Sequence, residues 1–158
     1  MSLELEPLTA AAFAPFGDVL DLAPGDPGRF DRVADLRDDR RGLPPNVVLI
    51  RAAATPLPTA VQRLERHPFS SQLFAPFGMA ARFPVVVAPD RDGRPDPAGL
   101  RGFLCEGARG VVYAPGVWHL PLVSLVPCRF LMLVYEAGDA DDTEFADLPA
   151  PVPLTGAA

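Results

Sequence analysis

Residues 128–136 read CRFLMLVYE, and this apolar run is the strongest strand signal in the chain. Four further runs rich in β-branched or aromatic residues precede it, with turn signals such as DRDGRPDPAG between them. These runs cover residues 46–52, 83–89, 99–105 and 119–125. Short strands separated by turns, without long helices between them, are typical of an antiparallel sandwich or barrel.

The sequence leaves little room for helix, because 20 prolines and 13 glycines interrupt its 158 residues. Residues 9–16 predict one short N-terminal helix, with Thr9 as its N-cap and Gly17 as its stop. Residues 55–64 are compatible with a further turn or two of helix. We therefore predict a single all-β domain over residues 1–158, ending in an acidic, proline-containing C-terminal tail at 139–158.

The composition excludes several classes of protein. With 49% hydrophobic and 22% charged residues the chain is globular, and the net charge of −6 argues against a nucleic-acid partner. It has no apolar run of the roughly 20 residues that cross a membrane. The N-terminal stretch lacks the basic residues of a signal peptide, so we expect a cytoplasmic protein.

All 14 cations are arginines, which excludes lysine Schiff-base chemistry. Cys105 and Cys128 lie in apolar segments, where we expect them to be buried without a function.

The two histidines of the chain are the candidate functional residues. His119 lies in GVVYAPGVWHLP and His67 in LERHPFSSQLFAPFG. Glu65 and His67 are two residues apart, so a strand would point both to one face, and a turn would bring Gln72 back beside them. Two strands of a small barrel would then gather these side chains with His119. A lone histidine among apolar residues is more often structural, so the residues alone leave both interpretations open.

The two histidine segments resemble the two cupin motifs. Glu65 stands at the first histidine position of the first motif, His67 at the second, and Gln72 at the glutamate position. In the second motif residues 116–119 match, with Pro115 one place closer to the glycine than usual. The resemblance implies a cupin-like antiparallel β-barrel, or jelly roll, with a short N-terminal helix, which agrees with the strand pattern.

A more specific resemblance is to the ureidoglycolate lyase family. It is carried by PFGDVLD, GRFDRVADL, ERHPFSSQLFAPFG, PVVVAP, LRGFL and GVVYAPGVWHLPL, which follow the family's order from residue 13 to about 135. The resemblance implies cleavage of ureidoglycolate to glyoxylate and urea in the breakdown of purines and allantoin. This reaction is an elimination that requires an acid and a base. The catalytic residues implied are His119, Glu65 and His67.

The family resemblance also implies how a small anionic ureido substrate is held. Gln72, Tyr113 and Ser71 are expected to hydrogen-bond the substrate, Arg32 to bind its carboxylate, and Trp118 to form a wall. Read without the resemblance, Tyr113 and Trp118 are ordinary core aromatics and Arg32 belongs to a solvated charged stretch. A homodimer is implied in the same way.

The expected site needs no metal in our first interpretation. The alternative is a divalent transition ion bound by the candidate ligands His67, Gln72, His119 and Glu65. The chain departs from the family at Ala34, Val112, Ala114 and Leu120, where polar residues are usual. These departures leave the identity of the substrate undecided. Two other functions therefore stay possible, a metal-dependent cupin isomerase or dioxygenase, and a cupin that binds a small molecule without turnover.

Overall fold

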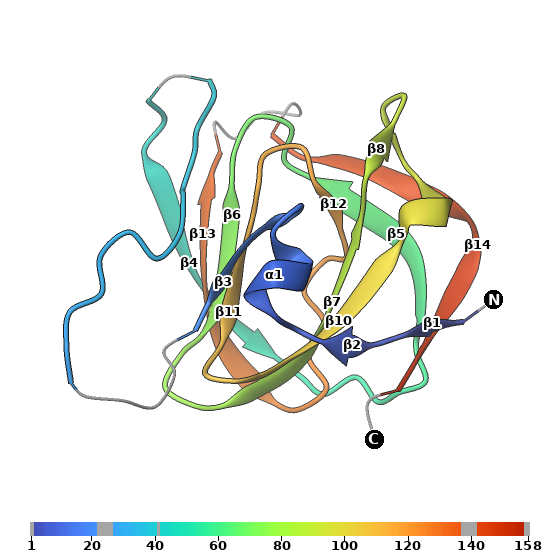
Figure 1. Cartoon of the computed structure of the whole chain (residues 1–158), viewed down its shortest axis with the longest axis horizontal. Helices are drawn as coiled ribbons and strands as arrows, with labels where there is room; N and C mark the ends of the chain where they lie inside the picture. The colour runs from blue at the N-terminus through green and yellow to red at the C-terminus, as the bar shows by residue number, and fades with distance from the viewer. Residues whose placement is uncertain (1, 22–26, 41, 137–141, 157–158) are drawn as a thin grey trace.

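The computed structural model describes residues 2–21, 27–40, 42–136 and 142–156, which fold into two facing sheets that form a nearly closed barrel (Figure 1). In spatial order, the seven-stranded sheet contains β1 (Leu3–Glu4), β14 (Glu144–Thr155), β5 (Ala60–Arg66), β12 (Trp118–His119), β7 (Ala81–Ala88), β10 (Arg101–Gly107) and β2 (Glu6–Pro7). The five-stranded sheet contains β3 (Gly17–Leu20), β11 (Gly110–Tyr113), β6 (Gln72–Pro76), β13 (Cys128–Tyr135) and β4 (Pro45–Ala52). The smaller elements are α1 (Ala10–Phe13), η1 (Pro97–Gly99) and the hairpin strands β8 (Asp90–Arg91) and β9 (Arg94–Pro95).

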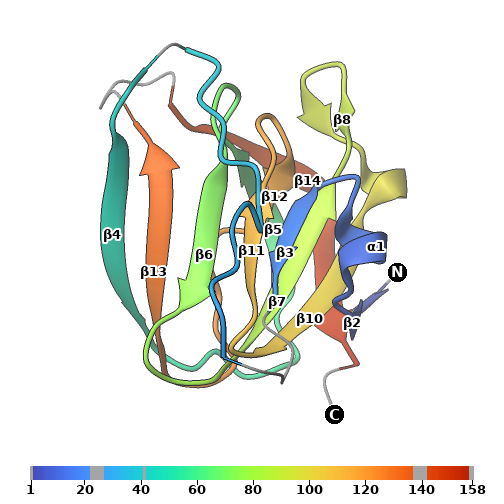
Figure 2. The same ribbon diagram turned by 60° about the vertical axis from the view of Figure 1, so that its left-hand side comes forward.

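This architecture confirms the predicted cupin-like all-β fold with a short N-terminal helix. The five strands of the smaller sheet lie side by side in Figure 2, with β4 at the free edge. The end of this sheet where β4 begins and β13 ends is at the top of that view, and we call it the upper end. No helix in the described part of the chain has the length and hydropathy of a membrane span.

The main core lies between the two sheets. Phe83 of β7 and Phe130 of β13 meet edge to face across it, with ring centroids 5.1 Å apart, and Phe13 of α1 is fully buried at one side. A second cluster surrounds Trp118, and it packs on the other face of β7. Because both faces of β7 are buried, its sequence is a continuous apolar run instead of an alternating one.

Helix α1 begins as the sequence predicts but ends earlier. Thr9 is its N-cap and accepts a hydrogen bond from the backbone N–H of Ala12 at 3.2 Å. The helix stops at Phe13, and residues 14–16 form a turn. Gly17 then adopts φ +144°, and a Cβ at this position would lie 1.9 Å from the carbonyl oxygen of Val112. Only glycine therefore allows β3 to approach β11 so closely.

Two predictions about the chain's outer segments are wrong. Residues 55–64, read from the sequence as compatible with a turn or two of helix, contain no helix; residues 60–66 form β5, since Val61 and Leu64 bury their side chains in the second cluster. The predicted C-terminal tail is, from Glu144 onward, strand β14, which pairs with β5 and buries Leu154 completely. Pro149 and Pro151 are tolerated because the pairing shifts register between Asp147 and Val152. Residues 139–141 and 157–158 of that segment lie outside the described residues.

The predicted strands are otherwise found within a few residues of their expected bounds, with one exception. Residues 119–125 were expected to form a strand, but β12 contains only Trp118 and His119. Beyond it, Ser124 makes an isolated bridge to Ala54. Pro121 has no N–H to donate, so it cannot continue a ladder in the middle of a sheet. The short strand is still enough to fix the side to which His119 points.

Candidate active site at the two histidines

Three strands bring the predicted catalytic residues together. His119 of β12 lies directly opposite Glu65 of β5, and Gln72 is the first residue of β6 in the facing sheet. His67 follows the last residue of β5. The His67 and His119 rings stack with centroids 5.9 Å apart, and both side chains are buried. The structure thus gathers Glu65, His67, Gln72 and His119 into one group, which we call the histidine cluster.

His119 faces an oxygen atom at each ring nitrogen. Its Nδ1 donates to the carbonyl oxygen of Val117 at 2.9 Å. Its Nε2 is 2.8 Å from Oε1 of Gln72 and 3.4 Å from Oε1 of Glu65. In a neutral ring with the proton on Nδ1, Nε2 would present a lone pair to these acceptors. Turning the Gln72 amide around would still leave the Glu65 carboxylate beside Nε2. Two side-chain oxygens therefore converge on Nε2 of His119.

His67 differs from His119 in the surroundings of its Nε2 atom. Its Nδ1 donates to the backbone carbonyl of Asp142 at 3.0 Å, and its Nε2 is buried without a hydrogen-bond partner among the described residues. Burial lowers the pKa of His67 below its usual 6.5, and nearby His119 lowers it further, whereas Glu65 acts against both. His67 is therefore a neutral imidazole near pH 7, with a free lone pair on Nε2. The two histidines therefore differ at Nε2: that of His67 has no hydrogen-bond partner among the described residues, and that of His119 faces two side-chain oxygens.

Tyr113 holds the His119 ring in place. The two rings stack with centroids 4.0 Å apart and an interplanar angle of 12°. Burial is the main reason that the pKa of the Tyr113 hydroxyl is raised well above its usual value. The phenol therefore stays protonated, and its contribution at neutral pH is contact and orientation.

The charged stretch at 31–40, interpreted from the sequence as a solvated face, is partly built into the site. Arg40 forms an ion pair with Asp142, and its Nη2 donates to the carbonyl oxygen of Tyr135 at 2.9 Å. The side chains of Arg40 and Asp142 are 19% and 5% exposed. Since the backbone carbonyl of Asp142 accepts from His67, this ion pair fixes the acceptor that orients the histidine. Sequence analysis missed both residues, which are 102 positions apart.

Three predicted binding residues lie outside the histidine cluster. Trp118 points to the opposite face of β12 from His119 and donates from Nε1 to Asp90 at 2.9 Å. Ser71 is buried, and its Oγ accepts from the backbone N–H of Arg37 at 3.1 Å. Arg32 lies exposed in a loop with φ +57°, and none of the described contacts joins it to the cluster. Their predicted roles in substrate binding remain predictions.

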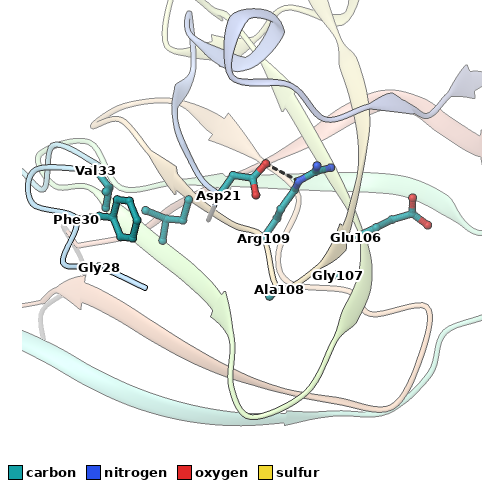
Figure 3. A pocket seen from close by; sticks show the side chains of 9 residues that line it. Asp21, Gly28, Phe30, Val33, Glu106, Gly107, Ala108 and Arg109 are labelled. Carbon is teal, nitrogen blue, oxygen red and sulfur yellow. Dashed lines mark hydrogen bonds and ion pairs between the residues drawn. The ribbon is translucent and has the colours of Figure 1, made fainter. Parts of the chain in front are cut away.

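A cavity of about 660 Å³ is lined by residues other than the histidines, and Figure 3 shows that lining. It is lined on one side by Phe30 and Val33 and on another by Arg109, which pairs with Asp21 at 2.8 Å. Its lining contains neither histidine and holds its one arginine in an ion pair. A second cavity, of about 250 Å³, is lined by Ser71 together with Val112 and Ala114, two of the positions at which the chain departs from the family.

The donor atoms of the histidine cluster fit a divalent metal ion. The ligand atoms of Glu65, His67 and His119 lie within 4.8 Å of one another, and Gln72 Oε1 adjoins His119. Both histidines donate from Nδ1 to a backbone carbonyl, which leaves Nε2 for coordination, as is usual for metal-binding histidines. The orphaned Nε2 of His67 would also gain a partner. Two imidazoles and two oxygens suit a transition ion.

Fold and cluster together define a class of protein: a cupin-like barrel whose two histidines, one carboxylate and one amide meet between its sheets. The model of the family described as "Ureidoglycolate lyase" matches residues 1–154, and the chain belongs to this family. A Burkholderia cepacia protein named "Ureidoglycolate lyase" is 40% identical over 144 residues, which is 86% of this chain and 80% of that protein.

Two further relatives carry the same name. One from Burkholderia mallei (strain NCTC 10229) is 39% identical over 162 residues, which cover 98% of this chain and 94% of the relative. One from Pseudomonas syringae pv. syringae (strain B728a) is 35% identical over 150 residues, which cover 90% of this chain and 87% of the relative. The match to the Burkholderia mallei protein covers 98% of the chain and so includes the segments that build the histidine cluster.

Proposed function

We propose that this protein is a ureidoglycolate lyase, which cleaves the C–N bond of ureidoglycolate to give glyoxylate and urea. The observation that carries the proposal is the pairing of a neutral His67, with a free Nε2, and a His119 whose Nε2 faces acceptors, beside one carboxylate. The reaction needs one group that takes a proton and one that gives a proton. Family membership supports the choice of substrate.

The base in this proposal is His67. The carbon that is cleaved carries a hydroxyl group and the nitrogen of the urea group. His67 Nε2 takes the hydroxyl proton, the oxygen forms a double bond to carbon, and the electron pair of the C–N bond leaves with the nitrogen. General-base assistance of this kind contributes about 10²- to 10⁴-fold. The low pKa of His67 keeps its lone pair available at neutral pH.

The acid is His119, which gives its Nε2 proton to the departing nitrogen so that neutral urea is released. Glu65 completes the cycle. Its carboxylate lies within 4.8 Å of a nitrogen of each histidine, so it can pass the proton from His67 back to His119. No covalent intermediate is needed, which is consistent with a cluster without a serine, cysteine or lysine nucleophile.

The substrate carries a carboxylate, and the charges around the cluster limit how it can bind. Arg37 and Arg40 are paired with Asp39 and Asp142, and Arg66, next to His67 in the chain, is paired with Asp90 and Glu144. Glu65 adds a further negative charge to the cluster. Because both histidine rings are buried, a substrate must also displace a covering segment to reach them.

A second mode of action is favoured by these charges and by the convergence of the donor atoms. A divalent ion held by Glu65, His67, Gln72 and His119 would, when bound, supply positive charge for the carboxylate and hydroxyl of the substrate. Such an ion uses the same lone pair of His67 as the acid–base mode. The two modes are therefore alternatives, and the effect of a chelator on turnover distinguishes them.

The experiment is a product balance with purified protein and ureidoglycolate against a protein-free blank, with and without a chelator and with Mn²⁺ added back. We expect urea and glyoxylate in equal amounts and no ammonia. Turnover that survives chelation supports the acid–base mode, whereas loss and recovery with Mn²⁺ support the ion mode. Ammonia as the nitrogen product, or no turnover by folded protein, would contradict the proposal. Cytoplasmic location stays a prediction from the N-terminal sequence, and a role in allantoin breakdown stays a prediction from the resemblance.

Metal binding itself gives a prediction that does not depend on turnover. We expect Co²⁺ to bind with one-to-one stoichiometry in calorimetric titration, with visible absorption bands from nitrogen and oxygen ligation. Gln72→Ala and His67→Ala are each expected to weaken binding at least about tenfold, because each removes a ligand atom. Trp118→Phe, which points away from the cluster, should leave the affinity unchanged. Equal affinity in all four proteins would show that the cluster is not the binding site.

A further inference from the structure

Two arginines of the five-stranded sheet stand directly opposite each other. Arg51 of β4 and Arg129 of β13 are partners in the strand register, and both are exposed. Opposed residues of an antiparallel pair share one face of the sheet, with Cβ atoms about 4.5–5.5 Å apart, and like charges at such positions destabilise the sheet. The strand pairing therefore holds two guanidinium groups within reach of one ligand.

The protein does not neutralise this arginine pair as it neutralises its other opposed arginines. In the seven-stranded sheet, Arg63 lies opposite Asp147 and Arg82 lies opposite Glu106, and each arginine forms an ion pair with its partner. None of the ion pairs among the described residues includes Arg51 or Arg129. Both positive charges are therefore available to a ligand.

The sequence around the pair also lacks acidic residues. The chain has 20 aspartates and glutamates and a net charge of −6, but none of them falls within residues 40–64, 66–89 or 107–135. These ranges contain β4, β6 and β13 with the turns at the lower end of the sheet, where β4 ends and β13 begins in Figure 2. The segments that flank the arginines add no negative charge, so the local potential favours an anion.

The two arginines line one cavity. Its volume is about 330 Å³, and its lining residues are Arg51, Ala52, Met79, Pro127, Cys128 and Arg129. Met79 is 42% exposed, so part of this lining is apolar surface open to solvent. The backbone N–H of Phe77, whose side chain is 49% exposed, donates to the carbonyl oxygen of Arg129 at 2.8 Å. The cavity thus combines two cationic groups with an apolar wall.

We propose that Arg51 and Arg129 bind the phosphate group of a small phosphate monoester, whose organic part lies against Met79. The planar fork of a guanidinium matches phosphate oxygens with two parallel hydrogen bonds. A phosphate monoester carries nearly two negative charges at neutral pH, which balances two arginines, whereas a carboxylate carries one.

This phosphate site is separate from the histidine cluster. Gln72 of the cluster is the register partner of Val134, which is five positions along β13 from Arg129, or roughly 17 Å along the strand. The cluster lies between the sheets, while both arginines are exposed to solvent. A ligand at the arginines therefore does not occupy the proposed active site.

Calorimetric titration with phenyl phosphate at low salt tests the site. We expect one molecule to bind per chain, with an affinity that falls as salt is added. Arg51→Met and Arg129→Met should each weaken binding at least about tenfold, because each removes charge-assisted hydrogen bonds. Arg94→Met is the matched control, since Arg94 is also exposed and outside the described ion pairs, but lies on β9. This variant and His67→Ala should bind like the wild type.

Two further ligands identify what the site recognises. Inorganic phosphate should bind more weakly than phenyl phosphate, because it lacks the apolar part, and benzoate more weakly still, because it has a single charge. Equal affinity for the two phosphates would overturn the role given to Met79. Folded wild-type protein that does not bind phenyl phosphate at millimolar concentration would overturn the inference, as would binding that both arginine variants retain. Arg51→Met should release glyoxylate at the wild-type rate, so the test is independent of the proposed function.

Discussion

A His67→Ala variant is expected to cleave ureidoglycolate at least about a hundredfold more slowly than the wild-type protein. The substitution removes the Nε2 lone pair that is buried without a partner in the cluster. That atom is the base of the acid–base mode and a ligand in the ion mode, so both predict the loss. The initial rate of glyoxylate formation, corrected for the protein-free rate, measures it.

A second substitution at the same position separates chemistry from packing. His67→Gln keeps a polar side chain of similar reach but has no basic nitrogen, so it should lose as much activity as His67→Ala. Thermal unfolding followed by circular dichroism shows whether both variants keep the fold. A folded His67→Gln protein with wild-type turnover would remove His67 from the mechanism and leave it as a buried structural residue.

Replacing Arg40 with Met is expected to lower the free energy of unfolding by about 3–5 kcal/mol. The substitution removes the guanidinium that forms an ion pair with the buried carboxylate of Asp142, which is 5% exposed. It also frees the segment whose carbonyl accepts from His67 Nδ1, so turnover should fall even under conditions where the variant is folded. Urea unfolding followed by tryptophan fluorescence gives the stability, since the chain has one tryptophan.

Arg63→Met is the matched control for this prediction. Arg63 also pairs with an aspartate, Asp147, but both side chains are more than half exposed, so solvent already screens the interaction. Its removal should change the stability little and leave the turnover unchanged. An equal loss of stability in the two variants would show that the Arg40–Asp142 ion pair has no special role.

The central strands of the barrel could be predicted from local sequence because they bury their side chains. The run at 83–89 is buried on both faces, and the run at 128–136 buries Phe130 and Val134 completely, so much of their apolar character follows from their position. Strand β14 could not be recognised in this way. Its prolines and acidic residues are typical of a loop, and only its long pairing with β5, through a register shift, makes it a strand.

The histidine cluster was predictable for a different reason. Glu65, His67 and Gln72 lie within eight residues of one another, so the two-residue period of a strand and one turn suffice to bring them together. The same alternation also implies that the neighbours Trp118 and His119 point to opposite faces of β12, which the structure bears out for Trp118. The role of Trp118 as a wall of the site stays a prediction.

The residues that support the cluster from outside had no local signal. Arg40 is one of several charged residues in a row, and its burial depends on Asp142, which is far away in the sequence. The acceptors of the two Nδ1 atoms are backbone carbonyls, which any residue type provides. Contacts of this kind depend on tertiary structure, and single-sequence patterns do not encode them.

The most direct test of the account is the initial rate of glyoxylate release from ureidoglycolate by the wild-type protein, His119→Ala and Trp118→Phe. His119 and Trp118 are adjacent and both buried, but only His119 belongs to the cluster. We predict release well above the spontaneous rate by the wild type, most of it kept in Trp118→Phe and nearly all of it lost in His119→Ala. The account would be contradicted by wild-type protein that does not exceed the spontaneous rate. It would also be contradicted by folded His119→Ala protein that releases glyoxylate as fast as the wild type.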